Sequence, residues 1–114
     1  FLMDDELSRS VVHQELGPLL KDQRMGEELI ETLSVYLRSR HNTHETARRM
    51  HLAPRTVTYR IRRVEELLGV RIDGDASARL GVALLVLHAI REAGRPIVAP
   101  EDPPSQNDGA TSRS

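Results

Sequence analysis

Two helical patterns separated by only three residues constrain the fold of this chain more than any other feature. From Pro54 to Leu68, apolar side chains recur at intervals of four, three and four residues, at Val57, Ile61, Val64 and Leu68. That spacing predicts a helix with one narrow apolar stripe. A shorter helix is expected from Thr43 to Met50, and His51-Leu52-Ala53 separates the two. These proportions are typical of a helix-turn-helix.

The residues at the ends of both helices agree with this interpretation. Asn42 followed three residues later by Glu45 is the Asn variant of a capping box, which begins the first helix. Pro54 is tolerated at the first position of the second helix, where its missing N–H costs nothing. Gly69 supplies the expected end after Leu68.

Close packing at the turn also fits the residues present. Two helices that cross steeply over a short turn approach closely, and Ala47 permits this approach. The space between the helices is expected to be filled by Met50, Leu52, Val57 and Ile61. The turn itself often opens with Gly, because a positive φ suits glycine there. His51 holds that position, so the turn is expected to be built differently or to be mildly strained.

The remaining segments also follow a helical period, and no strand of useful length is present. We expect helices over Glu27–Arg38 and Ser77–Ala93, and a helix with a bend over Asp4–Leu20, broken at Gly17-Pro18. Asp73–Asp75 is interpreted as a simple turn. The predicted class is all-α, with about five helices arranged as a helix-turn-helix domain.

The chain divides into three parts by composition. Residues 1–26 form the N-terminal helix and bend, residues 27–93 the helix-turn-helix domain with a C-terminal packing helix, and residues 94–114 a Pro/Ser/Gly-rich tail expected to be disordered. The 114 residues fit one small domain, and the start at Phe1 indicates a piece of a longer protein.

Composition limits the function classes. With one Phe, two Tyr and no Trp, the core must be aliphatic, and with no Cys, disulfides and Cys-based zinc sites are excluded. The longest strongly apolar run, Leu80–Ile90, is far shorter than the roughly 20 residues that span a bilayer. No signal peptide is visible, so a cytoplasmic protein without membrane contact is expected.

Charge is distributed unevenly along the chain. Residues 38–63 hold eight arginines and one acid, Glu45, a net charge of +7, whereas the remainder carries −8. Such asymmetry favours a polyanionic partner for the basic segment, most commonly nucleic acid.

The face of the second helix opposite its apolar stripe carries Arg55, Tyr59, Arg62 and Glu66. In the first turns of a recognition helix, Arg can pair with guanine and Thr can touch a thymine methyl group. Arg62 and Arg63 suit phosphate contacts, as do the free N–H groups around Thr43 and His44. The predicted DNA-binding residues are therefore Thr43, His44, Arg55, Thr56, Thr58, Tyr59, Arg62 and Arg63. Arg60, near the stripe, is expected to be a structural ion-pair partner.

These residues allow two other interpretations. Arginines on an exposed helix face are often only solvated. The histidines at 41, 44 and 51 lack Cys or clustered carboxylates, so surface histidines rather than a metal site are expected. Enzyme motifs are absent, among them a phosphate loop, HExxH and G-x-S-x-G, so neither catalysis nor a cofactor is predicted.

Four stretches resemble, in order, the C-terminal helix-turn-helix domain of the PucR-type bacterial transcription regulators, which include the sugar-diacid regulators. They are "LGPLL" at 16–20, "ELIETLSVYL" at 28–37, "ETARRMHLAPRTVTYRIRRVEELLG" at 45–69 and "ARLGVALLVLHAI" at 78–90. The most specific part is "TVTYRIRRVEELLG" at 56–69, against the family's "TLxYRxRRxEELLG". The helix-turn-helix of this domain is similar to that of Fis.

This resemblance implies a DNA-binding output domain at the C-terminal end of a longer regulator whose upstream part senses a signal. Thr56, Tyr59, Arg60, Arg62 and Arg63 match the pattern of the family's recognition helix. The chain departs from it at 53–55, where the family commonly has His-Arg-Asn and this chain has Ala-Pro-Arg, and at position 44, where His replaces Ser. The operator of a relative therefore does not transfer.

The prediction is a sequence-specific binder of double-stranded DNA that acts as a homodimer. The apolar Leu80–Ile90 and the helix from Leu7 to Leu16 are the expected dimer surfaces. The alternative is a protein-interaction or dimerisation module that kept the fold without DNA binding. The sequence does not name the operator, the regulated genes, the effector or the direction of regulation.

Overall fold

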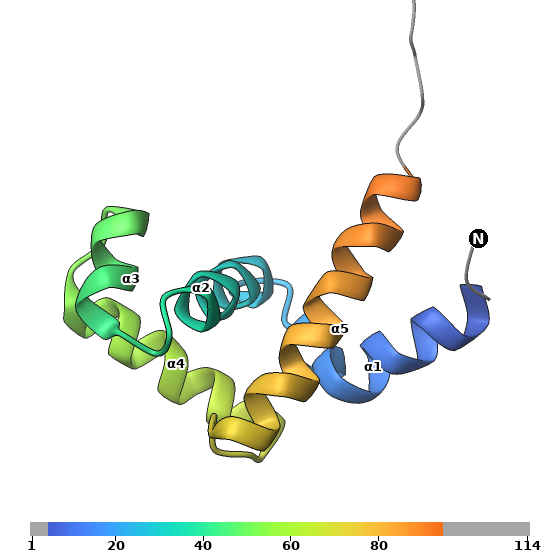
Figure 1. Ribbon diagram of the computed structural model, residues 1–114, viewed down its shortest axis with the longest axis horizontal. Coiled ribbons are helices and arrows are strands. Elements are labelled where there is room, and N and C mark those ends of the chain that lie inside the picture. The colour runs from blue at the N-terminus through green and yellow to red at the C-terminus, as the bar shows by residue number, and fades with distance from the viewer. Residues whose placement is uncertain (1–4, 95–114) are drawn as a thin grey trace, which may run out of the picture.

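A computed structural model describes residues 5–94, and the regular structure within this range is entirely helical (Figure 1). The five helices are α1 (Asp5–Lys21), α2 (Gly26–Arg38), α3 (Thr43–Met50), α4 (Pro54–Leu68) and α5 (Gly74–Ala93). The predicted all-α class with about five helices is confirmed. None of these helices is both long and apolar enough to cross a bilayer. The tail expected to be disordered, 94–114, lies outside the described residues from position 95 onward.

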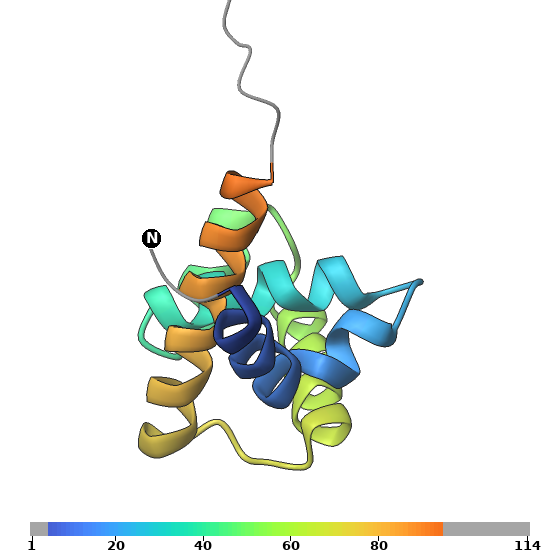
Figure 2. The same ribbon diagram turned by 90° about the vertical axis from the view of Figure 1, so that its right-hand side faces the viewer.

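Helix α2 occupies the middle of the molecule. Helices α3 and α4 lie at one end of it, and α1 and α5 lie at the other, with α1 and α5 packed against each other (Figure 1). The second view shows α4 behind α1 and α2, and the long connection that leads from the end of α4 to the start of α5 (Figure 2). The helix-turn-helix pair therefore projects from a base made by the other three helices.

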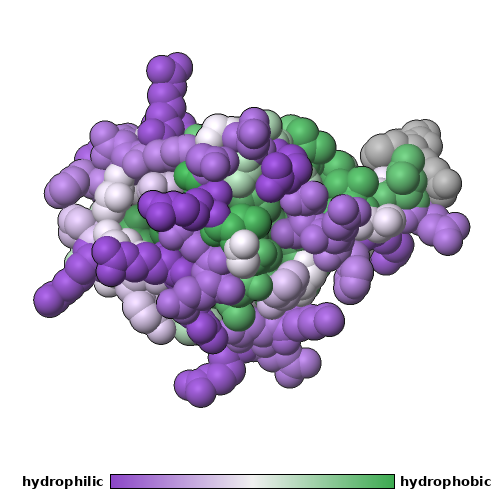
Figure 3. Space-filling view, turned by 90° about the horizontal axis from the view of Figure 1, so that it is seen from below, coloured by the Kyte–Doolittle hydropathy of each residue, from purple (hydrophilic) through white to green (hydrophobic). Residues whose placement is uncertain are grey.

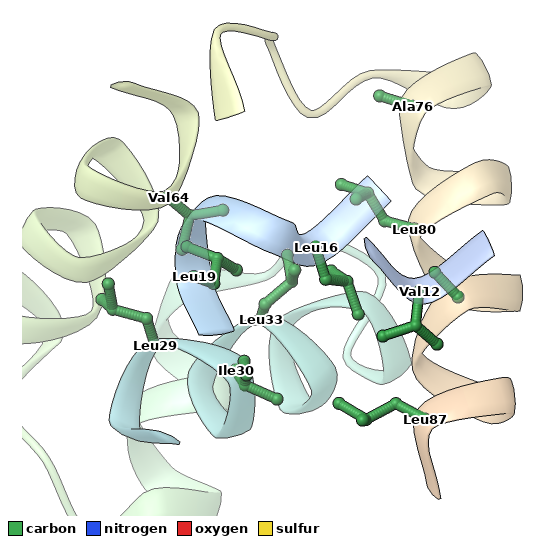
Figure 4. Close-up of a cluster of buried hydrophobic side chains, with 11 residues drawn as sticks. Val12, Leu16, Leu19, Leu29, Ile30, Leu33, Val64, Ala76, Leu80 and Leu87 are labelled. Atoms are coloured by element: carbon green, nitrogen blue, oxygen red, sulfur yellow. The ribbon is translucent and has the colours of Figure 1, made fainter. Parts of the chain in front are cut away.

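The main core is aliphatic, as the scarcity of aromatic residues predicted. Side chains from α1, α2, α4 and α5 converge on it (Figure 4). Its buried members are Val12, Leu16, Leu19, Leu29, Ile30, Leu33, Val64, Ala76, Leu80, Ala83 and Leu87. Burial of a Leu, Ile or Val side chain contributes roughly 1.5–3 kcal/mol, so this cluster is the main source of stability in the domain.

Helix α1 continues through Gly17 and Pro18 to Lys21, so the predicted break at these residues is wrong. A proline inside a helix removes one backbone hydrogen bond and crowds the preceding turn. Here Leu16 and Leu19, on either side of the Gly17-Pro18 pair, are completely buried in the core. Their burial holds the last turn of α1 in helical form despite the proline.

The connection between α1 and α2 is tight. Asp22 accepts hydrogen bonds from the backbone N–H groups of Arg24 and Met25, each at 3.0 Å. The bond from Met25 is the largest cause that lowers the pKa of the Asp22 carboxyl. At Gly26 the backbone of α2 passes so close to α1 that an added Cβ would lie 2.3 Å from the carbonyl oxygen of Leu19. Only glycine fits at this crossing.

Helix α5 begins at Gly74, three residues earlier than predicted. The side chain of Asp73 accepts a hydrogen bond from the N–H of Ala76 at 3.0 Å, which makes Asp73 the N-cap. The prediction of a simple turn at Asp73–Asp75 is therefore wrong for residues 74 and 75, which are helical. At the other end of α5, Arg91 forms a bidentate ion pair with Glu27 of α2.

Candidate nucleic-acid interface

Helix α3 begins at the predicted cap. The side chain of Asn42 accepts a hydrogen bond from the N–H of Glu45 at 2.9 Å, and the hydroxyl of Thr46 donates to the carbonyl oxygen of Asn42 at 2.8 Å. In a full capping box the residue at position 45 would reach back to the backbone of Asn42. The Glu45 carboxylate instead turns along the helix toward two arginines, so only half of the box forms.

Of the two alternatives for the turn between α3 and α4, a different construction or mild strain, the structure shows the strained backbone. His51 adopts the left-handed conformation, with φ 58° and ψ 44°, and caps the C-terminus of α3. The N–H of Leu52 then returns to the carbonyl oxygen of Ala47 at 2.9 Å. Left-handed backbone costs a non-glycine residue roughly 1–2 kcal/mol. The tight turn therefore forms despite this backbone cost.

The two helices of the pair share a small hydrophobic cluster of their own. Ala47 on α3 is almost fully buried against Val57 and Ile61 of α4. Partly buried side chains that complete the cluster are Tyr36, Leu52 and Ile72. Ala47 thus provides the close approach that was predicted, and the stripe on α4 divides between this cluster and the main core, to which Val64 belongs.

Arg60 connects α4 to α2. Its guanidinium donates to the hydroxyl of the buried Thr32 at 3.2 Å and lies 3.7 Å from a carboxylate oxygen of Glu28. Only 16% of the Arg60 side chain is exposed. The prediction that Arg60 is a structural ion-pair partner is confirmed.

The outward face of α4 is polar, and three of its side chains are unengaged. Arg55 and Arg62 are exposed, and Tyr59 is 58% exposed. The side chains of these three residues form no hydrogen bond or ion pair with any other residue of the 5–94 range. In addition, α4 begins at Pro54, and its N-cap residue Ala53 provides no side-chain cap. The N–H groups of Thr56 and Val57 bond to the carbonyl oxygen of Ala53, so two arginines, a tyrosine hydroxyl and the N–H of Arg55 remain open to an external partner.

The other predicted site residues lie beside this face. Thr56 and Thr58 are half-buried on the two flanks of α4. Arg63 is 40% exposed and donates to Glu66 at 3.2 Å, a pairing that the sequence analysis did not include. Thr43 and His44 are the first two residues of α3, and His44 is exposed. The structure thus brings the eight predicted residues onto α4 and the start of α3.

The ion pairs of Glu45 with two arginines on α3 were not predicted from the sequence. Glu45 binds Arg48 through two hydrogen bonds and binds Arg49 at 2.8 Å. These bonds, with Arg48 the larger contributor, lower the pKa of the Glu45 carboxyl from 4.5 to about 2. The spacings of three and four residues could have indicated these contacts. Glu45 therefore stays ionised and partly neutralises the charge of α3.

His41 is a second residue whose role the sequence analysis missed. Its ring stacks on that of Tyr36, with centroids 5.1 Å apart, and its Nε2 lies 2.8 Å from the hydroxyl of Ser77. Both His41 and its neighbour Arg40 have positive φ angles. His41 thus fixes the α2–α3 turn to the first turns of α5. Nothing in the local spacing indicated a contact across thirty-six positions.

Within residues 5–94, no group of three or more His, Asp or Glu side chains is arranged to hold a metal ion. The histidines at 41, 44 and 51 occupy different places: one in the stacked turn, one on α3 and one in the left-handed turn.

A family model describes the same region. Residues 29–86 match the model of the PucR C-terminal helix-turn-helix domain, which is about half of the chain. The chain belongs to this family. The match includes α3, α4 and most of α2 and α5, which are the helices that build and support the outward face of α4.

A curated relative agrees with this assignment. The chain is similar to the purine catabolism regulatory protein of Bacillus subtilis (strain 168), with 36% identity over 84 residues. The aligned part is 73% of this chain but only 16% of the relative, so the chain spans a small share of that protein's length. No solved structure gave a significant match.

Proposed function

We propose that this chain is the output domain of a bacterial transcription regulator and that it binds double-stranded DNA in a sequence-dependent way. The coarse assignment follows from the family, whose domain belongs to transcription regulators. DNA binding and sequence dependence are the steps that we add.

One observation carries the proposal: Arg55, Tyr59 and Arg62, on the exposed face of α4, have no side-chain partner within residues 5–94. Val57, Ile61 and Val64 anchor the opposite side of this helix in the hydrophobic clusters. Arg55 and Arg62 point away from that anchor and are unpaired within residues 5–94. A helix of this kind, rigid on one side and cationic on the other, is suited to the major groove.

The residues divide by the part of DNA that each would meet. Arg55, in the first turn of α4, would pair with a guanine, and Tyr59 and Thr58 would lie against neighbouring base edges or sugars. Arg62 and Arg63, further along the helix, would contact phosphates. The free N–H of Arg55 at the start of α4 and the N–H groups of Thr43 and His44 would bind phosphate oxygens.

Two copies would read paired half-sites, and the signal would be sensed by another domain of the full-length regulator. In a two-fold pair, recognition helices lie about 34–36 Å apart, or at multiples of one helical turn. This arrangement is part of the proposal and follows the usual symmetry of helix-turn-helix proteins.

Selection from random DNA with the 114-residue chain, followed by sequencing, tests the proposal. We expect an enriched motif whose affinity falls with salt, with a slope of about −0.9 for each phosphate neutralised. A protein-interaction module without DNA binding would give neither result. The absence of binding at low salt, even after artificial dimerisation, would overturn the proposal.

A further inference from the structure

Helix α5 is apolar on two sides, and the fold covers only one of them. Leu80, Ala83 and Leu87 are buried in the main core. On the opposite side the exposed residues are Ala78, Val82, Leu85 and Ala89, which we call the α5 stripe. Val82 is 55% exposed and Leu85 is 71% exposed. A stripe of this kind on a small domain indicates an uncovered interface.

This distribution corrects the expected dimer surfaces. Leu80 and Leu87 were included in the apolar run offered for pairing, but they face the core and cannot meet a partner. Leu16 of α1 is completely buried for the same reason. On α1, Leu7 remains 62% exposed, as a single side chain.

The α5 stripe borders a groove of about 700 Å³ between α2 and α5. Leu37 and Leu84 lie in its lining, and Val82 and Leu85 form part of its wall. Viewed from below, the molecule also exposes hydrophobic surface in the middle of the face and toward α1, with hydrophilic side chains around it (Figure 3). Apolar surface on this chain is therefore not limited to scattered side chains.

The order of residues along the α5 stripe is self-complementary. Its four members are spaced four, three and four residues apart, which is the spacing of a coiled-coil seam. Their sizes read the same in both directions: small, large, large, small. An antiparallel copy of the helix would therefore set alanine against alanine at both ends and Val82 against Leu85 in the middle. The stripe itself contains no charged residue, and the polar side chains nearest to it, Arg38 and His88, lie in the lining of the groove.

We propose that a second copy of this chain covers the α5 stripe, with its α5 antiparallel to the first. Val82 of each copy faces Leu85 of the other, and each Leu85 enters the groove beside Leu37 of the opposite copy. The alanines at the ends and the adjacent Gly81 allow the helices to approach toward the short end of the usual interhelical range, about 8 Å.

Charge favours a second copy at this position. Six of the eight arginines of the basic segment 38–63 lie on α3 and α4, at the end of the molecule away from α5, whereas Arg38 lines the groove (Figure 1). Pairing through α5 keeps the two basic surfaces apart and leaves both free. A seam about 16 Å long buries less than the roughly 800 Å² per partner of a standard interface. The free pair is therefore weak and is strengthened when DNA holds two copies together. The strengthening of the pair by DNA rests on the proposed function, whereas the pairing itself needs no DNA.

The absence of cysteine makes the contact directly testable. Two single variants, Val82→Cys and Leu85→Cys, are mixed under mild oxidation without DNA, with Gln23→Cys on the exposed α1–α2 connection as the control. Disulfides require Cα atoms within about 7 Å. We expect the mixed 82–85 disulfide to form roughly tenfold faster than the control, because pairing raises the effective concentration of the thiols. Rates equal to the control, or a preference for 82–82 pairs, would overturn the proposal.

A charge variant separates this inference from DNA binding. Leu85→Glu changes an exposed side chain, so the fold should persist, which circular dichroism checks. We expect it to abolish the crosslinking of Val82→Cys when both changes are combined, and to remove cooperative binding to paired half-sites while binding to one half-site remains. Undiminished crosslinking in the combined variant would contradict the proposal. If no DNA is bound by any variant but the 82–85 disulfide forms, the proposed function fails and the pairing stands.

Discussion

The guanidinium of Arg60 donates to the hydroxyl of Thr32 across the interface between α4 and α2, at 3.2 Å. Thr32 is completely buried, and its own hydroxyl donates to the carbonyl oxygen of Glu28 at 2.7 Å. One side chain of α4 thus contacts the base of the domain, while Arg55, Tyr59 and Arg62 on the same helix have no side-chain partner within residues 5–94.

Arg60→Met is expected to lower the free energy of unfolding by roughly 1–3 kcal/mol, because it removes a charge-assisted hydrogen bond inside a half-buried network. Urea denaturation of the purified chain measures the change. Arg62→Met, at an exposed site on the same helix, is the matched control and should stay within about 0.5 kcal/mol of the parent. Equal stability of the two variants would contradict a structural role for Arg60.

Gly26→Ala should be among the most damaging single-methyl changes in the chain. The new Cβ would lie 2.3 Å from the backbone carbonyl oxygen of Leu19, and neither backbone can move without disturbing the core. We expect a loss of at least about 2 kcal/mol, within the usual range for overpacking and backbone shifts. Gly81→Ala has no atom within 4 Å of the new Cβ, and it should instead stabilise α5 by about 0.5–1 kcal/mol. Thermal unfolding of the two variants should therefore move in opposite directions.

His51→Gly should stabilise the turn between α3 and α4. His51 has a φ of 58°, a region in which glycine has no steric penalty. The expected gain is up to about 1 kcal/mol, since the relief of strain is partly offset by the greater freedom of glycine in the unfolded chain. His44→Gly, inside the helical part of α3, should lose stability by a similar amount. A loss of stability in His51→Gly would show that the histidine side chain has a stabilising contact that outweighs its backbone cost.

Arg55→Ala and Arg62→Ala should affect DNA binding in different ways. Arg55→Ala is expected to relax the preference at one base position, at a cost of about 1–3 kcal/mol, because the arginine pairs with a base edge. Arg62→Ala should weaken binding to all DNA sequences alike and reduce the slope of log K against log salt by about one unit. Arg63→Ala should resemble Arg62→Ala. Competition binding on single-base variants of the selected site distinguishes these patterns, and identical specificity profiles for Arg55→Ala and the parent would refute a base-reading role.

The stability contributed by Glu45 should depend on pH in a defined direction. Its pKa falls from 4.5 to about 2 in the folded chain, through the hydrogen bonds from Arg48 and then Arg49. A lowered pKa favours the folded state above about pH 4.5, and this contribution is lost as the pH falls toward about 2. The melting temperature of Glu45→Gln should therefore lie below that of the parent near neutral pH and converge with it in acid. High salt should narrow the difference, because the group is exposed. A carboxyl titration of Glu45 with a midpoint at its ordinary value would contradict this account.

Local signals in the sequence were sufficient for much of this fold. The ranges of α3 and α4 follow from Asn42, Pro54 and Gly69, which act on the nearest turn of the backbone. The exposed face of α4 follows from the period of its buried stripe. The start of α5 was missed because Asp73 followed by glycine fits a turn as well as an N-cap, and only the bond to Ala76 decides between them.

Contacts between distant segments could not be predicted in the same way. The stacking of His41 on Tyr36 and its bond to Ser77 depend on how α2 and α5 meet. The side of α5 that is buried could not be predicted either, because the helix is apolar almost all round and its sequence does not say which side meets α1. The Glu45 carboxylate binds Arg48 and Arg49 instead of the backbone N–H of Asn42. All of these groups lie within reach of its side chain, so the sequence did not decide between them.

Ala53, Pro54 and Arg55, at the entrance to the recognition helix, are all exposed and add nothing to either hydrophobic cluster. Changes in these residues therefore leave the packing of the domain intact. A lineage can exchange them one at a time, without first acquiring compensating mutations in the core. Under the proposed function, regulators with this domain can therefore differ in the DNA sequences they bind while the stability of the domain stays nearly constant.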